Sequence, residues 1–262
     1  MNAFFALLRI SFRSNSAYRL DCLLGLVSTC LQVFISCAIW RTLFGTNSRV
    51  SGISFAMVAT NFVIAQGLGN AFVFNDFAVR RKLSDGSIAM DMLRPVSFRL
   101  SLLASNLGDI MFTLLTRFAP TVVIAYLFIG MVPPANIAAI LLFCISTALG
   151  FAVLWAISTV VQMTAFWIIN VWSVSTIKNV VVNVFSGAFL PLWFLPKGFA
   201  RIVRYTPFDC IYFIPIRIYL GQVAGAEVFY SWAKQLVWFI AIYTFATVLW
   251  HRGKTKVFIQ GG

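Results

Sequence analysis

The chain has 262 residues, of which 61% are hydrophobic and 10% are charged, with a formal net charge of +13. A mean hydropathy of +0.91 excludes an ordinary soluble domain and predicts an all-α polytopic membrane protein. The positive charge would also suit nucleic acid. However, the basic residues stand in short segments between apolar runs, as anchoring at a membrane surface requires. We therefore expect contact with membrane lipids and no nucleic-acid partner.

The first segment, residues 1–19, is expected to form an amphipathic helix in the membrane interface. At about 100° per residue, Arg9 and Arg13 share one narrow face, and Phe5 and Leu8 lie on the neighbouring arc. A short basic amphipathic helix of this kind lies in the interface plane. A disordered tail is the alternative.

Six apolar runs follow that are long enough to cross a bilayer core of about 30 Å. They lie near residues 22–44, 54–74, 103–131, 136–162, 171–192 and 232–250. With the N-terminus inside, eleven Lys and Arg residues fall on the cytoplasmic side and seven outside. This excess favours cytoplasmic positions for both termini.

The longest polar connection, residues 75–99, is expected to lie in the cytoplasm. It contains a basic helical turn, a turn signal and a helix-stopping proline: Arg80–Lys82, Asp85-Gly86 and Pro95. The pattern predicts a short helix across the cytoplasmic end of a span, suited to a groove in a partner. A solvated connector that carries anchoring charges explains the pattern equally well.

Polar residues form a stripe along the fifth predicted span. Its members recur at helical spacing, with Lys178 beside them: Ser175, Asn179, Asn183 and Ser186. Polar groups at this depth do not face lipid without cost. They either line a transport path or hydrogen-bond to neighbouring helices, and the spacing does not separate these two interpretations.

The third predicted span carries opposite charges at Asp109 and Arg117. The two residues are about 12 Å apart by helix rise, so they need Thr113, water or another helix between them. Arg19 and Asp21 stand where the first span begins. We expect all four charged residues to form structural charge pairs, because buried opposite charges generally pair.

The segment of residues 187–221 is too apolar for a loop and too broken for a span. It holds four of the chain's 8 prolines, separated by aromatic and basic residues. Proline breaks a helix interior, and non-helical backbone at membrane depth survives only where protein or a water-filled cavity satisfies it. We therefore expect a re-entrant extracellular helical hairpin between the fifth and sixth spans.

Motifs for catalysis are missing. The sequence contains no G-x-x-x-x-G-K-[ST], so no P-loop can bind ATP phosphates. His251 is the single histidine and cannot alone build a metal site or a catalytic triad. We expect no catalytic residues, no metal site and no enzymatic activity in this chain.

Together these elements resemble the ABC-2 type ABC transporter permeases. The stretches that carry the resemblance are FFALLRISFRSNSAYRLDCLLGL (4–26), DMLRPVSF (91–98), SGAFLPLWFLP (186–196), IPIRIYLG (214–221) and IQGG (259–262). More narrowly, the chain is similar to an uncharacterised bacterial ABC-2 permease family in which two permeases often accompany one ATPase. The resemblance implies one permease domain over residues 1–262, with an ABC-2 (type V) exporter-like fold.

The resemblance also implies roles for particular residues. Those coupling the chain to an ATPase would lie in the connection 75–99: Arg80, Arg81, Lys82, Asp85, Met90, Asp91 and Arg94. The translocation path would be lined by Gln66, Asn70, Ser175, Lys178, Asn179, Asn183 and Ser186. An outer gate within residues 187–221 would comprise Phe189, Leu190, Trp193 and Phe194.

The resemblance implies that the chain is one half of an exporter and holds no cofactor itself. ATP and Mg would bind to a partner ABC ATPase, which is expected in two copies. A second ABC-2 permease, a different chain or otherwise a second copy, would complete the path in the bacterial cytoplasmic (inner) membrane. The aromatic gate suggests an amphipathic or hydrophobic substrate: drug, peptide, lipid or lipid-linked glycan. The main alternative is an ion-driven secondary transporter or channel subunit. Such a protein would need internal repeats or charged relay residues, and the sequence shows neither clearly. A membrane scaffold that transports nothing is a further alternative.

Overall fold

The computed structural model describes residues 3–16, 19–88 and 98–260, and most of this part of the chain is helical. The α-helices are α1 (Ala3–Ser16), α2 (Arg19–Phe44), α3 (Phe55–Ala71), α4 (Ala78–Ser84), α6 (Phe98–Thr113), α7 (Ala119–Phe128), α8 (Ile137–Met163), α9 (Val171–Phe185), α10 (Lys197–Arg204), α11 (Phe213–Tyr219) and α12 (Ala226–Gln260). A π-helical turn, Leu114–Phe118, joins α6 to α7, and short 3₁₀ turns cover Thr164–Phe166 and Leu192–Phe194.

A two-stranded hairpin connects α2 to α3. Its strands, β1 (Arg49–Val50) and β2 (Ile53–Ser54), are antiparallel and pair Val50 with Ile53. Ser51 and Gly52 form the turn with φ angles of 52° and 81°. Positive φ at both central residues is typical of the tight type I′ turn that suits the twist of a hairpin.

Within the described residues, four helical stretches are long and apolar enough to cross a membrane. They are Leu20–Phe44, Arg99–Phe128, Ile137–Phe166 and Ala226–Thr255. They confirm the prediction of a polytopic membrane protein. The helices at the second and fifth predicted spans are shorter, with 17 residues in α3 and 15 in α9. The fifth prediction, 171–192, was too long, because the helix ends at Phe185 and Gly187 takes a φ of 84°.

Helix α2 exposes a broad apolar surface. The side chains of Leu20, Leu24, Phe34 and Leu43 are each more than half exposed. Water does not tolerate a contiguous apolar surface of this size, so lipid or another protein must cover it. The surface therefore agrees with a membrane location for α2.

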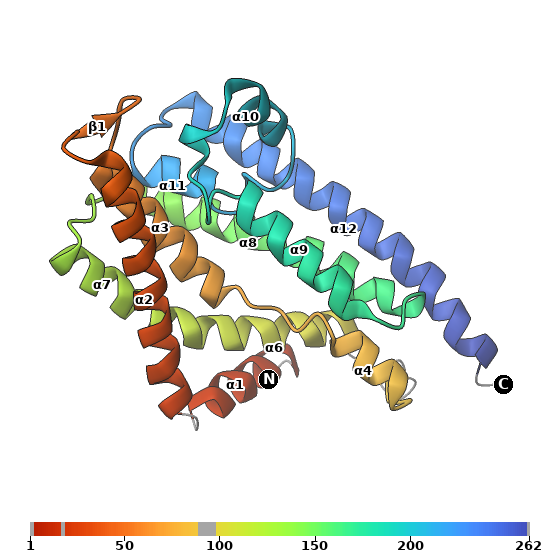
Figure 1. Ribbon diagram of the computed structural model, residues 1–262. Helices are drawn as coiled ribbons and strands as arrows, with labels where there is room; N and C mark the ends of the chain where they lie inside the picture. The colour runs from red at the N-terminus through yellow and green to blue at the C-terminus, as the bar shows by residue number, and fades with distance from the viewer. Residues whose placement is uncertain (1–2, 17–18, 89–97, 261–262) are drawn as a thin grey trace.

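Helix α3 forms the centre of the core. Val58, Phe62, Ile64 and Leu68 are all at most 2% exposed. Most residues of α3 are apolar, and the helix packs against α2, α7 and α11. Figure 1 shows α3 inside the bundle, behind α2.

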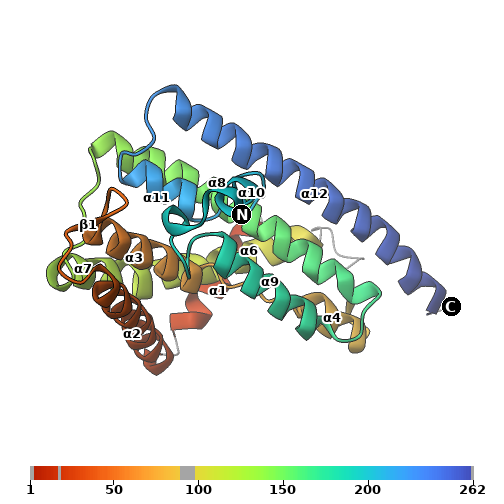
Figure 2. The same cartoon turned by 45° about the horizontal axis from the view of Figure 1, so that its top comes forward.

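The elements gather at two ends of the molecule. Helices α1 and α4 lie at one end, and the β-hairpin and α10 lie at the opposite end (Figure 1). Helix α12 runs along one side of the bundle beside α8 (Figure 2). Helix α4 of the basic connection and helix α10 of the proline-broken segment thus lie at opposite ends, as the sequence predicts.

The predicted N-terminal helix is present as α1 and packs closely on α6. The rings of Phe12 and Phe112 lie 5.5 Å apart, edge to face. Gly108 permits the approach, because a Cβ there would lie within 2.4 Å of the Leu8 carbonyl oxygen.

Short helices and turns make up residues 187–221. After the 3₁₀ turn and α10, the chain turns at residues 205–212 and continues into α11, which ends before Gly221 (φ 69°). The turn is in close contact with α8, since a Cβ on Gly150 would lie 2.5 Å from the Ile211 carbonyl oxygen. The prolines therefore break the helix as predicted, and the broken segment is packed rather than loose.

Candidate functional site

Helix α4 packs on the end of α8 and on the 3₁₀ turn that follows α8. Val79 and the neighbouring Ile88 are almost fully buried, and they cluster with residues from α8, the 3₁₀ turn after it and the start of α9. Leu249 and Trp250 of α12 pack against the same cluster. The apolar side of α4 is thus packed against its own chain.

The basic turn of α4 provides that other side. Arg81 is exposed, and Arg80 and Lys82 are half-buried. Asp85 ends the helix before Gly86 (φ 73°), which confirms the predicted turn. The hydroxyl and backbone N–H of Ser87 hold the pKa of the Asp85 carboxyl below its usual value, so this carboxylate stays charged.

Three residues of the proposed coupling set, Met90, Asp91 and Arg94, lie outside the described residues. The structure therefore places only the first half of the predicted connection. That half combines an apolar side packed on its own chain with a basic side that includes the exposed Arg81.

A buried ion pair ties the start of this connection to α9. The Asp76 side chain is 3% exposed and accepts hydrogen bonds from Lys178 Nζ at 2.7 Å and from Ser175 Oγ at 2.5 Å. Lys178 Nζ also donates to Ser158 Oγ on α8 at 3.2 Å. The second carboxylate oxygen, Asp76 Oδ1, is buried and has no hydrogen-bond partner.

Sequence reasoning missed Asp76. A signal was nevertheless present, because a lysine inside an apolar helix needs a counterion and the chain offers only 7 acidic residues. Asp76 stands five residues after the end of α3, at the start of the connection 75–99 that we expected to lie in the cytoplasm. Its burial depends on how α8 and α9 pack, which no local pattern reveals.

The polar stripe of α9 divides between two environments. Ser175 and Lys178 face inward to Asp76, whereas Asn179 and Asn183 are exposed. Ser186 is fully buried, and its hydroxyl has no hydrogen-bond partner. The first turn of the stripe therefore forms hydrogen bonds within the protein, whereas its middle is exposed at the surface of the chain.

Gln66 and Asn70 do not join the α9 stripe through any described hydrogen bond. Gln66 Nε2 donates to Ser36 Oγ at 2.7 Å, and Asn70 Nδ2 donates to Thr29 Oγ1 and Gln32 Oε1 at 3.2 and 3.0 Å. All three partners lie on α2. These hydrogen bonds form a polar seam between α2 and α3, as expected of polar residues that join helices in a membrane.

The proposed gate residues lie at the opposite end of the molecule from α4. Phe189 is 73% exposed, and Leu190 is half-buried. Trp193 donates to Gln222 Oε1 at 3.2 Å, and the Phe194 ring lies 4.7 Å from that of Trp40 on α2. The aromatic residues thus join the broken segment to α2 and leave Phe189 uncovered.

In the third predicted span Arg117 forms its ion pair with another helix, whereas Asp109 hydrogen-bonds a neutral amide on α1. Arg117 donates to Asp21 of α2 at 2.8 Å, and Asp109 accepts from Asn15 of α1 at 2.6 Å. Thr113 does not bridge Asp109 and Arg117, since its hydroxyl donates to the Asp109 carbonyl oxygen. The π-helical turn that contains Arg117 was not predicted; it ends two residues before Pro120, which cannot donate an N–H. The Arg19 side chain lies outside the described ones.

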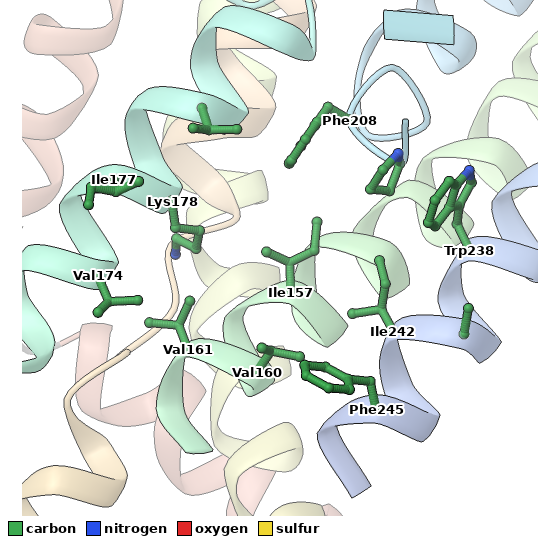
Figure 3. Close-up of a pocket in the computed structure, with 13 residues that line it drawn as sticks. Ile157, Val160, Val161, Val174, Ile177, Lys178, Phe208, Trp238, Ile242 and Phe245 are labelled. Atoms are coloured by element: carbon green, nitrogen blue, oxygen red, sulfur yellow. The ribbon is translucent and has the colours of Figure 1, made fainter. Parts of the chain in front are cut away.

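A groove of about 500 Å³ opens between α8, α9 and α12. Its walls are apolar, with Ile157, Ile177 and Phe245 on three helices and Phe208 above them (Figure 3). Lys178 is its one charged lining residue, and its ammonium group is already paired with Asp76. The groove therefore offers a hydrocarbon surface and no free charge.

These features define an integral membrane protein built from long apolar helices, with a basic helix at one end and a packed, proline-broken segment at the other. The description "ABC-2 family transporter protein" belongs to the family whose model matches residues 26–261. The chain belongs to this family, whose members are membrane transport components and generally work with an ABC ATPase. A comparison with curated proteins found no relative that matches.

Proposed function

We propose that this chain is the permease subunit of an ATP-driven ABC-2 exporter, and that α4 is the helix on which the ATPase docks. The observation that carries the proposal is the two-sided character of α4. Val79 belongs to an apolar cluster with residues of α8 and the start of α9, against which α12 packs, while Arg81 remains exposed. A force applied to the basic side would therefore reach the long helices directly.

Six membrane crossings follow from this proposal, with α3 and α9 as the two shorter ones. At 1.5 Å rise per residue, α3 and α9 extend about 25 and 22 Å, and the polar seam and stripe explain why they need not be apolar throughout. Both termini then lie in the cytoplasm of a bacterial cell, on the same side as α4. Residues 187–221 form the re-entrant hairpin on the outer side.

A second permease is supported by the open part of the α9 stripe. Asn179 and Asn183 are exposed on a helix whose other exposed residues include Trp172, Ile177 and Val180. Amide side chains do not face lipid without cost. A partner permease, either a different chain or a second copy, would cover them and enclose a path along α9.

The same arrangement suggests the class of substrate. A path bordered by Asn179 and Asn183 and closed outside by Phe189 offers both amide groups and aromatic surface. Such a path suits an amphipathic or hydrophobic molecule, among them a drug, a peptide, a lipid or a lipid-linked glycan. ATP and Mg belong to the two ATPase subunits and not to this chain.

Charge reversal on α4 tests the proposal. The variant Arg80→Glu/Arg81→Glu/Lys82→Glu should still insert in the membrane but lose the ATPase subunit when the complex is purified in mild detergent. The matched control is Lys197→Glu/Arg201→Glu/Arg204→Glu, which makes the same change of charge on α10 at the other end of the molecule (Figure 1).

The proposal requires that the α10 variant keep the ATPase and that the α4 variant lose it. Equal retention by both variants would show that α4 does not dock the ATPase. A native complex without any nucleotide-binding subunit would favour the alternative, an ion-driven transporter.

A further inference from the structure

Movement of α4 also acts on the short connection that joins it to α3, residues 72–77. This connection is held by side chains from two other helices. Gln162 Nε2 of α8 donates to the Asn75 carbonyl oxygen at 3.2 Å, and Asp76 binds Lys178 and Ser175 of α9. Two residues after Asp76, α4 begins.

The Asp76–Lys178 pair is well suited to carry force. Both side chains are at least nine-tenths buried, at 3% and 9% exposure. Charges attract more strongly where the surroundings are less polar than water, and a charge-assisted hydrogen bond is stronger than a neutral one. Such a contact resists separation, so the connection and α9 should move together.

Helix α9 is also attached to α3 at its other end. Asn61 Nδ2 of α3 donates to the Gly187 carbonyl oxygen, just beyond α9, at 2.9 Å. Between these two attachments lie Asn179 and Asn183, the exposed part of the stripe. A shift at the Asp76 end would therefore tilt α9 about its Gly187 end and move the two amides.

We propose that Asp76 is a positioning residue that transmits the ATP-driven movement of α4 to α9 through its ion pair with Lys178. This inference rests on the proposed function, because it assumes that α4 docks the ATPase. It adds a specific role for a buried contact between a cytoplasmic connection and the helix that borders the path.

The experiment uses the complete complex of permease and ATPase, with Asn179→Cys as a reporter and the exposed Cys144 replaced by serine. The rate of maleimide labelling is measured without nucleotide and after trapping with ATP and vanadate. In the parent complex, trapping should change the rate about tenfold, as expected when nucleotide shifts most of the population from one state to another.

Three variants then test the ion pair. Asp76→Ala removes the ion pair but leaves the charge of the buried Lys178 without a counterion. Asp76→Ala/Lys178→Met removes both charges, a change that proteins often tolerate well. Ser158→Ala is the matched control, because it removes a hydrogen bond of Lys178 to α8 and keeps the ion pair. The double variant should hydrolyse ATP while its labelling rate changes less than about twofold on trapping; the control should respond like the parent.

A double variant that folds and still shows the full change in labelling would overturn the inference, since a merely structural pair is dispensable once both charges are gone. The single variant must also lose the change. Failure of the proposed function has a different signature: no ATPase subunit would co-purify with the parent chain. An ATPase-containing parent complex whose labelling rate does not change on trapping would also overturn the inference, since α9 would then not move.

Discussion

Gln235 of α12 is the residue whose replacement tests the packing around the broken segment most sharply. Its side chain is fully buried and makes three hydrogen bonds. Ser146 Oγ donates to Gln235 Oε1 at 3.0 Å, while Gln235 Nε2 donates to the carbonyl oxygens of Ser146 and Cys210 at 3.0 and 2.8 Å. One amide thus joins α12, α8 and the turn at residues 205–212.

The variant Gln235→Leu keeps the approximate volume and removes all three hydrogen bonds. Polar contacts between membrane helices contribute about 0.6 kcal/mol each on average, so three account for about 2 kcal/mol. Leaving the buried Cys210 carbonyl oxygen without this donor adds about 1 kcal/mol at the lower end of the usual penalty. We expect the free energy of unfolding to fall by about 2–3 kcal/mol.

Equilibrium unfolding of the purified chain in mixed detergent micelles measures this change. Gln222→Leu is a matched control, because Gln222 is only half-buried and its side-chain oxygen accepts a hydrogen bond from Trp193. This replacement should lower the free energy of unfolding by about 1 kcal/mol or less. A loss below about 0.5 kcal/mol for Gln235→Leu would refute the reasoning that this amide holds the broken segment in place.

Two further substitutions test individual contacts. Gly108→Leu should displace α1, since even a Cβ would meet the Leu8 carbonyl oxygen at 2.4 Å. In the same unfolding assay the free energy of unfolding should fall by about 1–3 kcal/mol. An unchanged stability would contradict the close packing of α1 on α6. Asp21→Asn should cost no more than about 1 kcal/mol, because its carboxylate is 75% exposed; a larger loss would show that this ion pair is shielded from solvent.

Composition and periodicity were enough to predict much of the fold. Runs of apolar residues located the helices, because only a continuous apolar stretch is stable in lipid. Prolines located the broken segment, and Asp85-Gly86 located the end of α4. Helix ends were less accurate: the fifth helix ends at Phe185 because Gly187 allows a left-handed turn that composition does not reveal.

Pairing between distant residues could not be predicted from the sequence. Arg117 has Thr113 and Asp109 as neighbours on its own helix, yet it pairs with Asp21 on α2. The same is true of Asp76 and Lys178, which are 102 residues apart in the chain. Spacing along one helix reports which residues share a face, but the partner across the interface depends on tertiary packing.

The composition of the native complex is the most direct test of the central claim that this chain is an exporter permease. We predict that native mass spectrometry of the chain, extracted from its own membrane in mild detergent, will show one assembly with two ATPase subunits and two permease chains. The Arg80→Glu/Arg81→Glu/Lys82→Glu variant should yield permease chains alone. An intact native assembly that contains no nucleotide-binding subunit would contradict the account.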